Sequence, residues 1–311
     1  MTTFPPLQSG RRRRLLGRMM SSYQLYILVL PTLLYFAIFQ YGPIYGLQIA
    51  FKRFVPSLGF FDSPWVGFTH FERFFQSYQF GLILKNTLVL SFYELLLFPI
   101  PILMALFLNQ IVQQRYKKFI QTVTYAPHFI STVVIVGMLY QFLSPRSGLI
   151  NQLIGLFGGE SIFFFASPLW FKTIYVFSGV WQNAGFAMII YLAALTSINP
   201  ELHEAAMVDG AGKLRRILLI DLPGIMPVII ILLILNMGQF MQIGYEKVYL
   251  MQNPLNIHSA EIIQTYVYKQ GIQQAQFSYA AAIGLFNNVI NCLLLLMFNY
   301  IARKTSQTSL W

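Results

Sequence analysis

Long apolar stretches separated by polar connections dominate the pattern of this chain. Crossing a hydrocarbon core of about 30 Å takes roughly 20 mostly apolar helical residues, and six stretches are that long. They run over Tyr23–Ala50, Asn86–Asn109, Phe119–Phe142, Trp170–Thr196, Ile225–Gly244 and Ala280–Ile301. Because Pro31, Pro99, Pro101 and Pro127 lie inside them, we expect kinked helices whose freed carbonyl groups are satisfied by neighbours. The pattern predicts an all-α membrane protein with six transmembrane helices.

Composition supports a membrane class and excludes several others. Of 311 residues, 56% are apolar and 10% are charged, whereas about a quarter are charged in soluble domains. The single cysteine, Cys292, can form neither an internal disulfide nor a cysteine cluster for a metal. We expect one membrane domain over 23–304 with its core at 83–302, between an N-terminal tail at 1–22 and a C-terminal tail at 305–311.

Basic residues predict the orientation of the spans. Lys and Arg number 21 against 10 Asp and Glu, a net charge of +11. Thirteen of the basic residues lie in the two tails and in the connections after spans two and four, and eight lie on the opposite side. Both termini are therefore expected in the cytoplasm. The run Arg11–Arg14 is interpreted as part of this topology signal, so no nucleic-acid partner is expected.

The connection between spans four and five, residues 199–223, predicts a short capped helix. Asn199 can accept a free amide hydrogen bond, Pro200 suits the first helical position, and Glu201 complements the helix dipole. Gly210 can take the left-handed conformation that ends a helix. A second amphipathic piece, Lys213–Leu222, is expected to turn at Pro223 into span five.

This connection resembles the cytoplasmic coupling loop of the permease subunits of bacterial ABC importers. The family pattern is Glu-Ala-Ala, three residues, Gly, nine residues, Ile, one residue and Leu-Pro. This chain meets it at Glu204, Ala205, Ala206, Gly210, Ile220, Leu222 and Pro223. The resemblance implies a coupling helix that fits a cleft on an ATP-hydrolysing subunit. The contact would be made by Glu204, Ala205, Ala206, Asp209 and Gly210.

Four further segments are similar to the LplB-like branch of the binding-protein-dependent transport permeases. They are YGPIYGLQIAFKRF from Tyr41, SPWVGFTHFERFF from Ser63, YAPHFISTVVIVGMLYQFL from Tyr125 and FSYAAAIGLFNNVIN from Phe277. The resemblance implies the type I (MetI-like) importer fold in a bacterial cytoplasmic membrane. It also implies a second homologous permease, two ATP-binding subunits, an extracytoplasmic solute-binding protein, and oligosaccharides or polysaccharide fragments as substrates.

Enzymatic chemistry has no support in the motifs. No GxxxxGK[ST] loop and no HExxH pair occurs, and the four histidines are scattered along the chain. We therefore expect a transport subunit without catalytic or metal-binding residues. By the resemblance, ATP and Mg²⁺ would be bound by the partner ATPase.

Amides and aromatic rings at membrane depth are candidates for a saccharide pathway, because amides bond hydroxyl groups and rings stack on sugar faces. The expected pathway residues are Trp181, Gln182, Asn183, Asn236, Gln239 and Gln242. The last three repeat at three-residue spacing and are expected on one side of span five. The alternative is that such amides bond one helix to another.

Glu94 is the one acid predicted to lie inside a span. A charged carboxylate there costs a few kcal/mol unless it is paired, protonated or near water. Glu94 could therefore couple transport to protons, as in an ion-coupled secondary transporter. Because no basic partner is evident from the sequence, we interpret Glu94 as structural and keep the ion-coupled transporter as the alternative function.

Overall fold

The computed structural model describes residues 23–306, 309 and 310, and these residues are helical or irregular. The chain divides into two compact units, whose boundary follows Gly67. Five helices of the described chain are long and apolar enough to cross a membrane, and a sharply bent helix pair supplies a sixth span. The prediction of an all-α membrane fold with six spans is confirmed.

The first unit is one long helical span followed by a short aromatic turn. The span, Tyr23–Phe51, comprises α2 (Tyr23–Tyr35), the π-helical η1 (Phe36–Tyr41) and the 3₁₀-helical η2 (Gly42–Phe51). After it, Lys52 Nζ donates hydrogen bonds to the carbonyl oxygens of Phe60 (2.6 Å) and Phe61 (3.2 Å), and α3 covers Gly59–Asp62. The apolar side chains of α2 are exposed to the surroundings, as expected of a helix that faces lipid.

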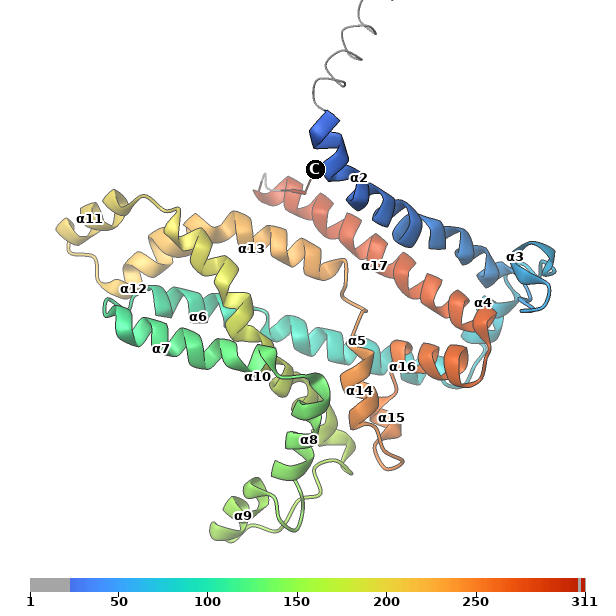
Figure 1. Ribbon diagram of the computed structural model, residues 1–311. Coiled ribbons are helices and arrows are strands. Elements are labelled where there is room, and N and C mark those ends of the chain that lie inside the picture. Colours follow the sequence, from blue (N-terminus) through green and yellow to red (C-terminus); the bar gives the residue numbers. More distant parts are fainter. Residues whose placement is uncertain (1–22, 307–308, 311) are drawn as a thin grey trace, which may run out of the picture. The chain divides into compact units, whose positions relative to one another are not determined.

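The second unit contains the other spans and their connecting helices (Figure 1). Its first half consists of α4 (Thr69–Phe75), α5 (Phe80–Leu97), α6 (Pro99–Asn109), α7 (Gln114–Tyr125), η3 (Ala126–Phe129), α8 (Thr132–Phe142), α9 (Leu149–Leu156) and α10 (Pro168–Thr196). Its second half consists of α11 (Pro200–Val208), α12 (Lys213–Arg216), η4 (Ile217–Asp221), α13 (Leu222–Met237), α14 (Tyr245–Met251), α15 (Ile257–Ala260), α16 (Ile263–Tyr268), η5 (Lys269–Gln273) and α17 (Phe277–Ser306).

The third span is broken, which corrects the prediction of one helix over Phe119–Phe142. The segments Gln114–Phe129 and Thr132–Phe142 meet at an angle of 100°. Pro127 offers no amide hydrogen for a helical bond, and Ile130 and Ser131 take extended conformations. The hydroxyl of Ser131 then caps α8 by accepting a hydrogen bond from the Val134 amide at 3.4 Å.

Span five also differs from its prediction at both ends. Instead of turning at Pro223, the helix runs without interruption over Lys213–Met237, because the π-helical turn η4 precedes the proline. A wider turn gives room to a ring that would collide with the carbonyl group four residues earlier in an α-helix. At the other end the helix stops at Met237, so Gln239 and Gln242 do not continue its face.

Close packing of α10 against its neighbours organises this unit. Ile102, Ala105, Met188, Tyr191 and Ile225 join α6, α10 and α13 in one buried apolar cluster. Gly185 of α10 lies against the backbone of α7, and an added Cβ would overlap the Thr124 carbonyl oxygen. Because lipid is as apolar as these side chains, such close approach is a main source of attraction between helices in a membrane.

The segment after span five, residues 245–276, forms a cap next to the N-terminal end of α10. Asn86 Nδ2 in α5 donates hydrogen bonds to the carbonyl oxygens of His258 (2.8 Å) and Glu261 (3.1 Å). Asn256 Nδ2 donates to the Phe165 carbonyl oxygen at 3.0 Å, and Lys269 pairs with Glu261 at 2.6 Å. This connection is partly helical, and buried polar contacts bind it to the bundle.

Candidate functional site

The helix α11 forms as its local sequence predicts. The Asn199 side-chain oxygen accepts a hydrogen bond from the Glu201 amide at 3.1 Å, and Pro200 occupies the first helical position. Gly210 has a φ of 74°, a left-handed conformation that few side chains tolerate. The amide of Ala211 returns to the Ala206 carbonyl oxygen at 2.8 Å, so the free carbonyl groups at the helix end are satisfied.

Most residues of α11 are exposed, and none is buried. Figure 1 shows α11 between α10 and α12, at an outer end of these helices. Of the predicted coupling residues, Ala206 is half-buried, whereas Glu204, Ala205, Asp209 and Gly210 are exposed. Three large apolar side chains of α11 are also exposed, namely Leu202, Met207 and Val208. A short helix that presents small, charged and apolar side chains together has the composition of a contact surface for another protein.

The buried end of the connection centres on Asp221, the last residue of η4, which is 0% exposed. Gln110, just past the end of α6, donates a hydrogen bond from Nε2 to Asp221 Oδ2 at 2.8 Å. His203 of α11 places Nε2 at 3.2 Å from Asp221 Oδ1. Three elements therefore meet at one carboxylate.

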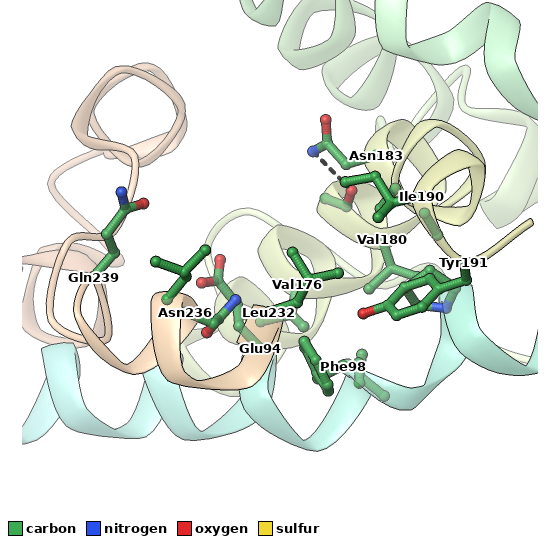
Figure 2. A pocket seen from close by; sticks show the side chains of 16 residues that line it. Glu94, Phe98, Val176, Val180, Asn183, Ile190, Tyr191, Leu232, Asn236 and Gln239 are labelled. Atoms are coloured by element: carbon green, nitrogen blue, oxygen red, sulfur yellow. Dashed lines mark hydrogen bonds between the residues drawn. The ribbon is translucent and has the colours of Figure 1, made fainter. Parts of the chain in front are cut away.

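A cavity of about 660 Å³ lies among α5, α6, α10 and α13 (Figure 2). Its polar lining consists of Glu94, Asn183, Tyr191, Asn236 and Gln239, and the rest is mainly apolar. Figure 2 shows the Glu94 carboxylate beside the Asn236 amide, with Asn183 and Gln239 on other sides of the space. A few hydrogen-bonding groups in an apolar wall are typical of small-molecule sites.

Three of the predicted pathway residues line this cavity, and three do not. Asn183, Asn236 and Gln239 belong to its lining. Trp181 instead lines a separate apolar groove with Met138 and Phe177. The side-chain nitrogen of Gln182 donates to the Ile130 carbonyl oxygen at 3.1 Å, and that of Gln242 donates to Asn288 Oδ1 at 3.3 Å. Gln182 and Gln242 thus connect segments of the bundle.

Glu94 and Tyr191 are cavity residues that the pathway prediction omitted. The sequence marked Glu94 as an intramembrane acid but showed no basic partner for it. In the structure Lys247 of α14 acts on it electrostatically, and the Tyr175 hydroxyl bonds its side chain. Lys247 Nζ also donates to the Tyr175 carbonyl oxygen at 3.3 Å. Lys247 lies in the cap, far from Glu94 in the sequence, so no local pattern could reveal this pairing.

Lys247 itself is buried, with 8% of its surface exposed. Burial lowers the pKa of Lys247 to about 8, and the negative charge of Glu94 offsets part of that decrease. Within the described part of the chain, no group of three His, Cys, Asp or Glu side chains is arranged to hold a metal ion.

Known proteins match the chain over nearly its whole length. Residues 98–307 match the family described as binding-protein-dependent transport system inner membrane component. The polygalacturonan/rhamnogalacturonan transport system permease protein YteP of Bacillus subtilis (strain 168) is 44% identical over 97% of this chain and 94% of its own. Protein LplB of the same strain is 43% identical over 99% of this chain and 97% of its own.

Solved structures agree with the relatives. A bacterial alginate ABC transporter, crystallised in complex with an alginate pentasaccharide-bound periplasmic protein, contains a chain with a TM-score of 0.88. That chain is 40% identical, and the match covers 96% of the present chain and 100% of the solved one. Another crystal structure, of a bacterial ABC transporter involved in the import of the acidic polysaccharide alginate, gives a TM-score of 0.87 at 41% identity over 94% of this chain and 99% of that chain.

Proposed function

The chain belongs to the family of binding-protein-dependent transport system inner membrane components, and from this premise we propose that it carries saccharide chains through the membrane. It is a multi-span permease subunit of a bacterial ABC importer and works with a periplasmic binding protein. It is a transport subunit and not an enzyme, because ATP hydrolysis in such an importer is carried out by a separate subunit. The comparisons give no support to the ion-coupled alternative.

The exposed helix α11 is the observation that carries the coupling part of the proposal. A capped helix with exposed apolar side chains and no buried residue contributes little to the core of its own chain. We infer that Glu204, Ala205, Ala206, Asp209 and Gly210 contact an ATP-binding subunit. One chain offers one such helix, so two ATP-binding subunits require a second, homologous permease. ATP and Mg²⁺ would be bound by the ATPase, and this chain would hold no cofactor.

The charge distribution supports an orientation with α11 in the cytoplasm. The connection that contains α11 and α12 carries Lys213, Arg215 and Arg216, and basic residues accumulate on the cytoplasmic side of bacterial membrane proteins. Both termini would lie on that side, in the cytoplasmic membrane of the cell. The N-terminal basic run, Arg11–Arg14, falls outside the described residues.

The cavity supplies the substrate part of the proposal. Amide, phenol and carboxylate groups at Asn183, Tyr191, Asn236, Gln239 and Glu94 can bond the hydroxyl groups of a sugar, while the apolar wall meets its ring faces. YteP is named for polygalacturonan and rhamnogalacturonan transport, and the solved transporter is involved in the import of alginate. We infer that this chain forms part of a pathway for oligosaccharides or polysaccharide fragments delivered by an extracytoplasmic binding protein.

In the proposed cycle, a loaded binding protein docks on the side opposite α11, and two ATPase subunits close on two coupling helices. Closure favours one of two packings of the spans, so that the cavity opens first to the binding protein and then to the cytoplasm. ATP binding supplies the bias between the two packings.

The coupling assignment is tested by co-purification of this chain with the ATPase subunits of its importer. Glu204→Lys reverses a charge on the exposed face, and Gly210→Val forces a branched side chain into a left-handed position. Both variants should lower the amount of bound ATPase at least fivefold. Glu160→Lys and Gly158→Val are matched controls, since Glu160 is exposed and Gly158 has a φ of 79° outside the coupling loop.

The substrate assignment is tested with the complete importer in proteoliposomes. Oligogalacturonates, rhamnogalacturonan fragments and alginate oligosaccharides, each with the cognate binding protein, should be screened for stimulated ATP hydrolysis and for uptake. At least one saccharide should stimulate both. Uptake without any ATPase subunit, or an importer that responds to none of these saccharides but to another class of solute, would contradict the proposal.

A further inference from the structure

The contact between α11 and span five is made by side chains that are not among the predicted coupling residues. His203 lies on α11 with 24% of its side chain exposed, and its Nε2 is 3.2 Å from Asp221 Oδ1. Among the described residues, the polar side-chain contact between α11 and another helix is made by His203. This contact joins the helix to the start of span five.

The partner carboxylate is held from a second direction. Gln110, which follows α6, donates its Nε2 hydrogen to Asp221 Oδ2 at 2.8 Å. The two oxygens of one fully buried side chain thus face two different elements, α11 and the end of α6. A displacement of α11 therefore acts on a group that α6 and span five share.

The burial of Asp221 favours a fixed geometry between α11 and span five. Taking a carboxylate out of water costs several kcal/mol unless charged or hydrogen-bonding partners compensate, so Asp221 strongly favours conformations that keep its partners close. Arg216, one turn earlier, also acts electrostatically on Asp221. Arg216 Nε and Asp221 Oδ1 are both buried, and neither has a hydrogen-bond partner among the described residues, so Oδ1 depends on the nearby positive charge of its ion-pair partner His203.

We propose that His203 and Asp221 are positioning residues that transmit the displacement of α11 to span five, and through Gln110 to the end of α6. This inference rests on the proposed coupling role of α11. The coupling loop would then have two functional sides. Its exposed side contacts the ATPase, and its half-buried histidine connects the helix to two spans.

The experiment measures how much saccharide is taken up per ATP hydrolysed by the complete importer in proteoliposomes. His203→Leu removes the imidazole that lies 3.2 Å from Asp221 at similar size, and Asp221→Asn removes the charge at the same size. Each should lower uptake per ATP at least fivefold, while the ATPase still co-purifies and basal hydrolysis stays within twofold. His203→Gln retains a donor and should preserve at least half of the wild-type ratio.

The double variant and a histidine control complete the test. Because both residues act through one contact, the double variant should be no worse than the more impaired single variant. His258→Leu, an exposed histidine of the cap, should leave the ratio unchanged.

An unchanged ratio in His203→Leu and Asp221→Asn would overturn the inference. Loss of the bound ATPase in both variants would also overturn it, because the pair would then serve assembly. If the wild-type complex itself bound no ATPase, the proposed function would fail instead.

Discussion

At the scale of single residues, the carboxylate of Glu94, in a span, interacts electrostatically with the ammonium group of Lys247, in the cap. Glu94 lines the cavity, and Lys247 comes from the cap at 245–276 and bonds the Tyr175 carbonyl oxygen at 3.3 Å. Each charge alone would be costly in this setting. The positive charge of Lys247 reduces the energetic cost of burying the Glu94 carboxylate, and the interaction connects the cap to the cavity wall. The interpretation of Glu94 as structural from its sequence alone omitted this partner.

The pair predicts a non-additive effect on stability. Glu94→Gln leaves Lys247 buried without its counter-charge, and Lys247→Met does the same to Glu94, so each variant should lower the melting temperature of the purified complex. The decrease in melting temperature of the double variant should be smaller than the sum of the decreases in the two single variants. From comparable contacts we expect an interaction energy of roughly 0.5–3 kcal/mol. Strictly additive losses would show that the two groups do not interact.

Lys247 also predicts a pH dependence. Its pKa in the folded chain is about 8, below the ordinary value of 10.5, so between these values the folded state binds fewer protons than the unfolded state. The contribution of Lys247 to stability should therefore rise as the pH increases from 8 to 10.5, and its full cost should be present below pH 8. Melting temperatures across pH 7 to 10.5 should be compared between the wild type and Lys247→Met. Equal slopes in both proteins would contradict this assignment.

At the scale of elements, helix ends and breaks decide where functional groups lie. The coupling helix α11 begins at a side-chain cap and ends at a left-handed glycine, and both signals act within a few residues. Span three breaks after Pro127, whereas span five continues through Pro223. Proline therefore has opposite effects on these two helices. The π-helical turn before Pro223 gives its ring room, so the helix continues, whereas the residues after Pro127 are extended and the helix breaks.

The cap of α11 gives a prediction for this element. Asn199→Ala removes the acceptor of the Glu201 amide and should destabilise the helix by about 1 kcal/mol. Hydrogen exchange of the α11 amides, followed by mass spectrometry on the purified complex, should become about fivefold faster for that energy. Asn199→Asp retains the acceptor and is the matched control, with exchange near the wild-type rate. Unchanged exchange in Asn199→Ala would show that contacts other than this cap stabilise the helix.

At the scale of the whole molecule, one chain supplies only part of a transport machine. The cavity of about 660 Å³ is lined by three spans of this chain, and the proposed coupling surface is a single helix, α11. Many large apolar side chains on the spans are exposed, for example Leu96 at 62% and Phe107 at 59%. Lipid and a second permease are the surroundings that such surfaces require.

The expected assembly has a definite stoichiometry. Native mass spectrometry of the complex purified from the source organism should detect one copy of this chain, one copy of a different permease and two ATPase copies. Binding protein should join when it is loaded with saccharide and hydrolysis is blocked. Two copies of this chain without another permease would contradict the heterodimer and would leave the other assignments intact.

Local and compositional signals determined much of this protein from its sequence. Apolar length identified the spans, since the bilayer imposes it. The capping residues Asn199 and Gly210 identified the short helix α11, since capping is a short-range effect. Family resemblance supplied the class of importer. The amide positions Asn183, Asn236 and Gln239 were expected near the pathway, but Trp181, Gln182 and Gln242 lie elsewhere, because helical spacing does not say where a helix stops or which side meets a neighbour.

Only the tertiary structure decided which distant groups meet. Lys247 acts electrostatically on Glu94, and His203 contacts Asp221, because helices from separate parts of the chain pack together. A linear pattern contains the charges but not their distances. The sequence therefore specified the spans and the coupling helix, whereas packing selected the partners, since electrostatic and hydrogen-bond energies depend on separation in space.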